Sequence, residues 1–156
     1  MQTAHETIPS SAREGSPAPG ALWNPLAAAG WSLVFTPAFG AYLQMRNWQA
    51  LGEPGQAAIA RKWLYASLAI LLADMLAAAL DARLNNESHA MHWIGFTFLG
   101  LWTIGAAWPQ ARLVRKRYGA AYPRKPWDHA LIGAVAAATA YAGASALLAF
   151  VFVSLT

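Results

Sequence analysis

Four long apolar segments, separated by short polar stretches, dominate the hydrophobic pattern of the chain. They lie at about residues 26–45, 63–82, 91–110 and 130–154, and the last contains no charged residue. A helix needs about 20 mostly apolar residues to cross the hydrocarbon core of a bilayer. Because backbone groups in hydrocarbon must be hydrogen-bonded internally, each segment is predicted to be a membrane-spanning helix. The predicted fold class is all-α, a four-helix transmembrane bundle of two helical hairpins within residues 23–156.

The first segment is the least regular of the four. Pro37 lies near its centre, with Gly30 and Gly40 on either side. Proline removes one helical hydrogen bond and usually kinks a helix, so a kinked span is predicted here. The alternative is a re-entrant or interfacial first segment, which leaves three spans. Residues 1–22 contain no apolar run and are rich in Ser, Pro, Ala and Gly, which predicts a disordered tail.

The composition supports a membrane protein. Hydrophobic residues make up 57% of the 156 residues and charged residues only 12%, whereas a soluble domain has about 25% charged residues. So little charge cannot cover a water-exposed globule, so a bilayer is expected to take up the apolar surface. The absence of cysteine excludes disulfides, thiolate metal sites and a cysteine nucleophile.

Basic residues gather in two of the polar connections. The first carries Arg46, Arg61 and Lys62, and the second carries Arg112, Arg115, Lys116, Arg117, Arg124 and Lys125. Because cytoplasmic loops are enriched in Lys and Arg, both connections are predicted on the cytoplasmic side of a bacterial inner membrane, with both termini periplasmic. The second cluster is expected to contact anionic lipid headgroups, and docking of an acidic partner is the alternative. This placement explains the net charge of +4 without a nucleic-acid partner.

Short motifs in these connections resemble a known group of proteins. The residues are Asn24-Pro25, then Asn47-Trp48-x-x-Leu51-Gly52, and later Tyr122-Pro123-Arg124-Lys125-x-Trp127. They are similar to motifs of small, functionally uncharacterised multi-pass inner-membrane proteins of proteobacteria. The resemblance covers the two basic connections and the first apolar segment. It implies the multi-pass topology and no activity.

Asp74 is the residue that the predicted architecture does not explain. It lies 11 residues after Trp63, or about 17 Å along a helix axis, near the middle of the bilayer. A carboxylate there is costly, so proton or cation handling is one hypothesis. The other is a neutral Asp74 that holds helices together by hydrogen bonds. The candidate partners are Thr36, Tyr42, Thr97, Thr103, Thr139, Tyr141 and Ser145.

Other residues carry weaker signals. The outer loop contains Asp81, Glu87, His89 and His92, and the two histidines could share a helix face as metal ligands or simply be solvated. No metal or other cofactor is predicted. The fourth segment has a face of small residues, which predicts close helix packing within the chain or between copies: Gly133, Ala137, Ala140 and Ala144.

Two classes of function are compatible with these observations. The first is a non-enzymatic interaction protein, either an immunity protein against a membrane-targeting toxin or an accessory subunit of a membrane complex. The second is a small transporter or channel that uses Asp74 and requires oligomeric assembly. Enzyme activity is not predicted, because one intramembrane carboxylate without an intramembrane histidine makes a poor catalytic set.

Overall fold

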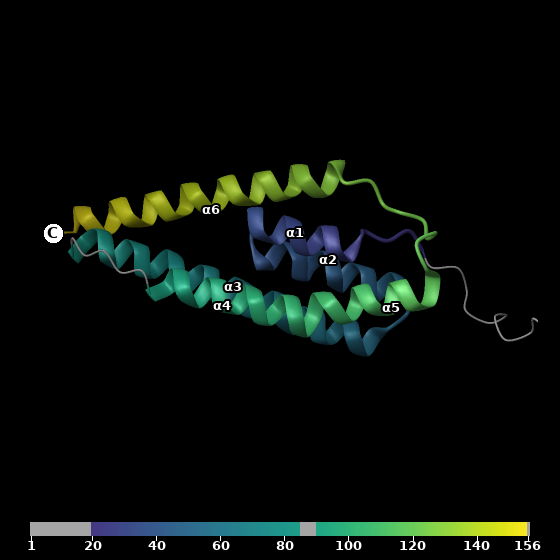
Figure 1. The fold of residues 1–156 in the computed structure, drawn as a ribbon. Coiled ribbons are helices and arrows are strands. Elements are labelled where there is room, and N and C mark those ends of the chain that lie inside the picture. The colour runs from purple at the N-terminus through teal and green to yellow at the C-terminus, as the bar shows by residue number, and fades with distance from the viewer. Residues whose placement is uncertain (1–19, 85–89, 156) are drawn as a thin grey trace, which may run out of the picture.

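The computed structural model describes residues 20–84 and 90–155, called the described residues below. Residues 1–19, most of the predicted disordered tail, lie outside them. Every regular element of the described residues is helical, which confirms the all-α class, and the helices run roughly lengthwise beside one another (Figure 1). The elements are α1 (Pro25–Val34), α2 (Pro37–Ala50), α3 (Pro54–Leu84), α4 (Ala90–Trp102), the π-helical η1 (Thr103–Ala107), α5 (Trp108–Tyr118) and α6 (Asp128–Ser154).

The chain reverses its direction between α1 and α2. A residue before proline is disfavoured in the helical region, and Thr36, which precedes Pro37, is extended with φ −169° and ψ 158°. Thr36 then caps α2, because its hydroxyl oxygen accepts a hydrogen bond from the Phe39 backbone N–H at 3.4 Å. Pro37 suits the first position of a helix, where no backbone donor is needed. The Thr36-Pro37 dipeptide thus ends one helix and begins the next.

The prediction of a single spanning helix at residues 26–45 is therefore wrong. The two helices lie antiparallel, because Asn47 bonds Trp23 at one end of the pair and Gly40 lies against Ser32 further along it. α1 has 10 residues and α2 has 14, or lengths of about 15 and 21 Å. Neither can cross a hydrocarbon core of about 30 Å. A proline kinks a helix only if the preceding residue stays helical, and here the extended Thr36 produces a reversal, so the pair is a helical hairpin.

Close contact within the α1–α2 hairpin depends on Gly40. A Cβ atom at this position would collide with the Ser32 hydroxyl on α1 and with the indole ring of Trp102 on α4. Trp102 is fully buried and packs in the core with Ala41 and Ala107. The missing side chain at Gly40 therefore lets the hairpin close on itself and rest against α4 at the same point.

Two helices, α3 and α6, are long and apolar enough to cross a membrane. Of the residues in their most apolar stretches, 11% are buried in α3 and 0% in α6. A core helix of a soluble protein would be largely buried, so this exposure favours a lipid environment. The two helices converge toward the C-terminus and separate toward the other end, where the α1–α2 hairpin lies between them (Figure 1).

The predicted third segment, residues 91–110, falls within one helical rod formed by α4, η1 and α5 over residues 90–118. The backbone stays helical at both junctions, with φ/ψ of −62°/−43° at Trp102 and −61°/−48° at Trp108. The π-helical turn ends two residues before Pro109, whose ring needs room beside the carbonyl of Gly105 and which has no N–H to bond that carbonyl. The wider turn provides that room without breaking the rod.

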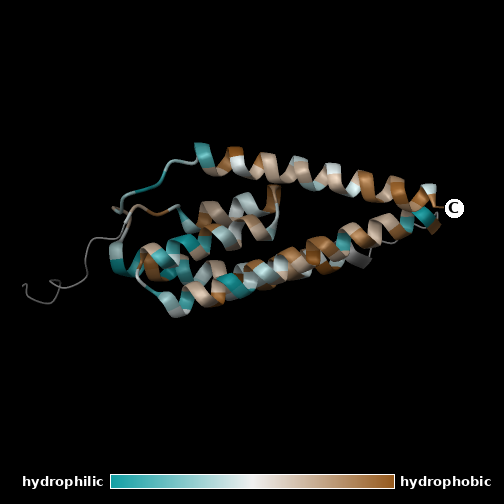
Figure 2. Ribbon diagram, turned by 180° about the vertical axis from the view of Figure 1, so that it is seen from behind, coloured by the Kyte–Doolittle hydropathy of each residue, from teal (hydrophilic) through white to brown (hydrophobic). Residues whose placement is uncertain are grey.

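Both basic connections lie at one end of the molecule, where Arg117 and Glu53 form an ion pair at 3.1 Å. The first described residues lie at the same end. The Leu22 N–H donates to the Pro123 carbonyl and the Lys125 N–H donates to the Leu22 carbonyl, both at 2.9 Å. Figure 2 shows polar residues concentrated at this end, and the C-terminus lies at the other. The prediction that both termini lie opposite the basic connections is wrong for the described N-terminal residues, because the hairpin returns the chain to its starting end.

Gly40→Ala tests the close packing of the hairpin. The added methyl group must displace Ser32 or Trp102, and overpacking of this kind costs about 1–3 kcal/mol. We expect a lower midpoint of thermal unfolding for the purified protein in detergent. Gly30→Ala is the matched control, because a Cβ at Gly30 meets no atom within 4 Å. Equal midpoints for the Gly40 variant and the unmodified chain would contradict this account of the hairpin.

Candidate functional site

Asp74 lies on α3 and faces α6. Its Oδ2 atom accepts a hydrogen bond from the Tyr141 hydroxyl on α6 at 3.0 Å. The same hydroxyl lies 3.2 Å from the backbone carbonyl of Leu71, almost one turn before Asp74. Among the described residues, Tyr141 alone of the predicted partners bonds this carboxylate; the other six do not: Thr36, Tyr42, Thr97, Thr103, Thr139 and Ser145.

The arrangement of Asp74, Tyr141 and Leu71 suits either protonation state of the carboxyl group. A hydroxyl carries one proton and two lone pairs. With an ionised carboxylate, Tyr141 donates its proton to Oδ2. With a protonated carboxyl group, Asp74 donates to the Tyr141 oxygen, and the Tyr141 proton turns to the Leu71 carbonyl. The Asp74 carboxyl group and the Tyr141 hydroxyl therefore keep hydrogen-bond partners whether or not the carboxyl group carries a proton.

Asp74 lines two cavities that meet beside the tip of the α1–α2 hairpin. One, of about 940 Å³, lies between α2, α3 and α6. The other, of about 240 Å³, lies between the hairpin tip, α3 and α4. Phe35, Thr36 and Leu71 line both cavities together with Asp74. Because Thr36 caps α2, the positive end of the α2 dipole lies at the same level as the carboxylate.

The larger cavity, called the α6 cleft below, is apolar along most of its length. Leu and aromatic side chains of α2 and α3 form one wall, and Ala and Gly residues of α6 form the other. Asp74 and Tyr141 lie at its inner end, and Trp23 and His129 lie near the basic connections. Binding sites for small molecules are typically clefts of about 300–1,000 Å³ with few polar groups. The α6 cleft has this size and character, and Asp74 is the one acidic residue among the described residues that line it.

A buried amide cluster, which sequence analysis did not predict, lies at the basic end. The Asn47 side chain accepts from the Trp23 N–H at 3.0 Å and donates to the Trp23 carbonyl at 2.8 Å. Asn47 also donates to Gln110 at 3.4 Å, and Gln110 donates to the Gln44 carbonyl at 3.0 Å. The cluster ties the entrance of the hairpin to α2 and α5, so we regard it as structural. Its one sequence signal is the presence of amide side chains at Gln44 and Gln110, inside otherwise apolar segments.

The six basic residues of the second connection do not form a single patch. Arg117 donates to Glu53, and this hydrogen bond is the main cause that raises the pKa of the Arg117 guanidinium above its ordinary value. The ammonium of Lys125 lies 4.2 Å from the ring centroid of Trp23, and Arg124 extends over a tyrosine ring. The remaining three are exposed on α5: Arg112, Arg115 and Lys116. An exposed ion pair such as Arg117–Glu53 contributes little stability.

The predicted small-residue face of α6 does not pack within the chain. None of its four residues is buried, and Gly133 and Ala137 line the α6 cleft. α6 packs against α3 instead, and Tyr141 and the buried Ala134 lie on that side. Packing of the four residues between copies stays a prediction: Gly133, Ala137, Ala140 and Ala144.

The proposed histidine pair cannot be placed. His89 and the side chain of His92 lie outside the described residues, as does Glu87. Asp81 lies on α3, seven residues beyond Asp74. Within residues 20–84 and 90–155, no group of three or more potential metal ligands comes together.

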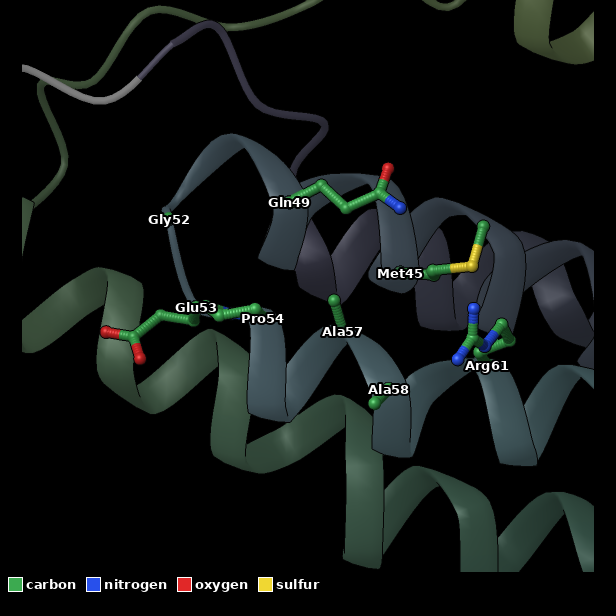
Figure 3. Close-up of a pocket in the computed structure, with 8 residues that line it drawn as sticks. All are labelled: Met45, Gln49, Gly52, Glu53, Pro54, Ala57, Ala58 and Arg61. Atoms are coloured by element: carbon green, nitrogen blue, oxygen red, sulfur yellow. The ribbon is translucent and has the colours of Figure 1, made fainter.

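A third cavity lies at the turn between α2 and α3, where Gly52 adopts φ 71°. Its volume is about 350 Å³. Figure 3 shows Arg61 beside Met45, whereas Glu53 points away from both, toward α5. Its one acidic side chain, Glu53, already pairs with Arg117. This cavity is therefore a weaker candidate for a ligand-binding site than the α6 cleft.

Comparison with known proteins adds no functional assignment. No family model, no curated protein and no solved structure matches the chain. The choice of the α6 cleft as the candidate site therefore depends on its shape, its lining and the carboxylate at its inner end.

Asn47→Ala tests the amide cluster. The change leaves the backbone N–H and carbonyl of Trp23 without their side-chain partners, and one buried polar group left unpaired costs about 1–3 kcal/mol. We expect a clear drop in the thermal unfolding midpoint in detergent. Gln49→Ala, at an exposed position of the same helix, is the control and should change the midpoint little. If both variants unfold alike, the cluster does not hold the hairpin in place.

Proposed function

We propose that this chain is a non-enzymatic integral membrane protein that binds a lipophilic cation in the α6 cleft, with Asp74 as the counter-ion. The observation that carries the proposal is one carboxylate at the inner end of an apolar cleft of about 940 Å³, with no Lys or Arg in its lining. Burying an unpaired charge is costly, so a lone carboxylate in such a site favours a positively charged occupant. Phe35, Phe39 and Tyr42 in the lining supply rings for cation–π contacts.

The proposal places the protein in a bacterial inner membrane. α3, the α4–α5 rod and α6 cross the bilayer, and the α1–α2 hairpin enters and leaves on one side. The basic connections assign that side to the cytoplasm. The first described residues are then cytoplasmic, the C-terminus is periplasmic, and the hairpin tip lies at mid-depth beside Asp74. Backbone that is not helical at this depth is tolerated where protein or a polar cavity surrounds it.

Transport of the bound cation is the form of this function that we favour. The Asp74, Tyr141 and Leu71 groups can satisfy their hydrogen bonds with or without the carboxyl proton, which supports exchange of a proton for a cation. Three spans are few for a transporter, so assembly of two or more copies belongs to the proposal. Ala140 and Ala144 of α6, which are exposed and lie outside the cleft lining, support such assembly, because small residues let helices approach closely.

A second candidate function is the binding of a partner protein, as an immunity protein or as an accessory subunit. The same exposed face of α6 supports it, since a partner's transmembrane helix could pack there and fill the cleft. In that case Asp74 only links α3 to α6 through Tyr141. The two candidates differ in what they require of Asp74, because only cation binding needs a group that can carry a negative charge.

Binding of tetraphenylphosphonium to the purified full-length chain tests the proposal. Asp74→Asn keeps the shape and can still bond Tyr141, but it cannot carry a negative charge. Removing one partner of a buried charge pair costs about 2 kcal/mol or more, so the affinity should fall about thirtyfold or more. The measurement is equilibrium binding of the radiolabelled probe in detergent.

Two controls make this test specific. Asp81→Asn removes a carboxylate from the same helix outside the cleft lining, and it should leave binding unchanged. A neutral tetraphenyl analogue should bind equally to the unmodified chain and to the Asp74 variant. Retention of tetraphenylphosphonium by the Asp74→Asn variant, at unchanged affinity, would reject cation binding and favour the partner-protein function.

A further inference from the structure

A second groove runs between α1 and the α4–α5 rod, away from the α6 cleft. It consists of two cavities that lie in line along the same helices. The one at the basic end has a volume of about 470 Å³ and includes Leu26, Ala111 and Arg115 in its lining. The deeper one has about 490 Å³ and includes Gly30, Gly100 and Ile104. We call the two together the α1–α5 groove.

The two cavities follow the same face of α1. Leu26, Gly30 and Leu33 follow one another at intervals of four and three residues, and therefore lie on one face of α1. On the rod, Gly100 and Ile104 are four residues apart and line the deeper cavity, and Ala111 lines the outer cavity beyond the π-helical turn. Added Cβ atoms at Gly30 and Gly100 would meet nothing within 4 Å. The absence of side chains there leaves open space along the deep part of the groove.

The two ends of the α1–α5 groove differ sharply in polarity. The deep cavity is lined by Ala, Gly, Leu, Phe and Ile residues, with Thr103 as its one polar side chain. That hydroxyl bonds the Leu99 carbonyl at 2.8 Å. The outer cavity includes two arginines in its lining, Arg115 and Arg124. A ligand that fits both ends must combine an anionic group with a hydrocarbon chain.

Arg115 and Arg124 are free to bind an anion. The one ion pair among the described residues joins Arg117 to Glu53, and neither groove arginine has an acidic partner. Arg124 lies over the Tyr122 ring at 5.6 Å from its centroid, which orients the side chain. The backbone on both sides of Arg124 is fixed by hydrogen bonds to Leu22 at 2.9 Å. Two positioned guanidinium groups suit a phosphate, because their fork geometry matches its oxygens.

We propose that the α1–α5 groove binds one anionic phospholipid of the cytoplasmic leaflet. Its phosphate lies between Arg115 and Arg124, and one acyl chain follows the apolar part of the groove toward Gly100. From Arg115 to Ile104 is about 16 Å along the rod, which matches one leaflet of a hydrocarbon core about 30 Å thick. The inference depends on the proposed membrane placement but not on cation binding in the α6 cleft.

Native mass spectrometry of the full chain in detergent tests this proposal. Phosphatidylglycerol should remain bound, about tenfold or more tighter than the zwitterionic phosphatidylcholine. The double variant Arg115→Gln, Arg124→Gln should lose phosphatidylglycerol affinity by about tenfold or more. The matched control Arg112→Gln, Lys116→Gln removes the same charge from the same region, outside the groove lining, and should bind as the unmodified chain does.

A second pair of variants tests the acyl part and does not alter charge. Gly100→Leu fills open space in the groove and should also lower phosphatidylglycerol retention by severalfold, whereas Gly143→Leu fills open space on α6 and should not. Equal losses in the two arginine-region double variants would overturn the proposal, because general surface charge would then explain binding. Competition by inorganic phosphate at the affinity of the lipid would also overturn it, since the site would then recognise a free anion.

Discussion

Pro37 cannot donate a backbone hydrogen bond, and it holds the preceding Thr36 in an extended conformation. The chain therefore turns back about halfway along the bundle. Three consequences follow from this reversal. The first described residues return to the end that carries the basic connections, the hairpin tip reaches the level of Asp74, and α6 is left with α3 as its main neighbour.

The α1–α2 hairpin is supported at its closest crossing and at its entrance. Gly40 allows α1 and α2 to touch at Ser32, and the same gap receives the ring of Trp102. At the entrance, Asn47 satisfies both backbone groups of Trp23. These contacts fix the position of the short α1–α2 hairpin between the longer helices. They also explain why the chain has both a cleft toward α6 and a groove toward the α4–α5 rod, since the hairpin fills only part of the space between the longer helices.

Much of the fold could be predicted from the sequence, and the part that could not has a physical cause. The long apolar runs at α3, interrupted by Asp74, and at α6 predict helices of spanning length, because a helix needs about 20 mostly apolar residues to cross a bilayer. The apolar surroundings of Asp74 in the sequence also predicted a hydrogen-bond partner on another helix, but Tyr141 was one of seven candidates, and only the packing of α6 on α3 selects it. The reversal at Thr36 could not, because the same proline is compatible with a kink or a turn, and only the contacts of Gly40 and Asn47 decide between them. Arg115 and Arg124 are nine residues apart in the sequence, and only the folded loop brings both into the lining of one cavity.

Labelling of single cysteines tests the central claim that the first apolar segment does not cross the membrane. The chain has no cysteine, so Gly20→Cys, Ala121→Cys and Leu155→Cys each provide one reactive site at a described position. A membrane-impermeant maleimide is applied to intact spheroplasts and to inside-out vesicles. A re-entrant hairpin predicts that positions 20 and 121 react only in inside-out vesicles and position 155 only in spheroplasts. Reaction of position 20 together with position 155 in spheroplasts would contradict the account, because the first segment would then span the bilayer.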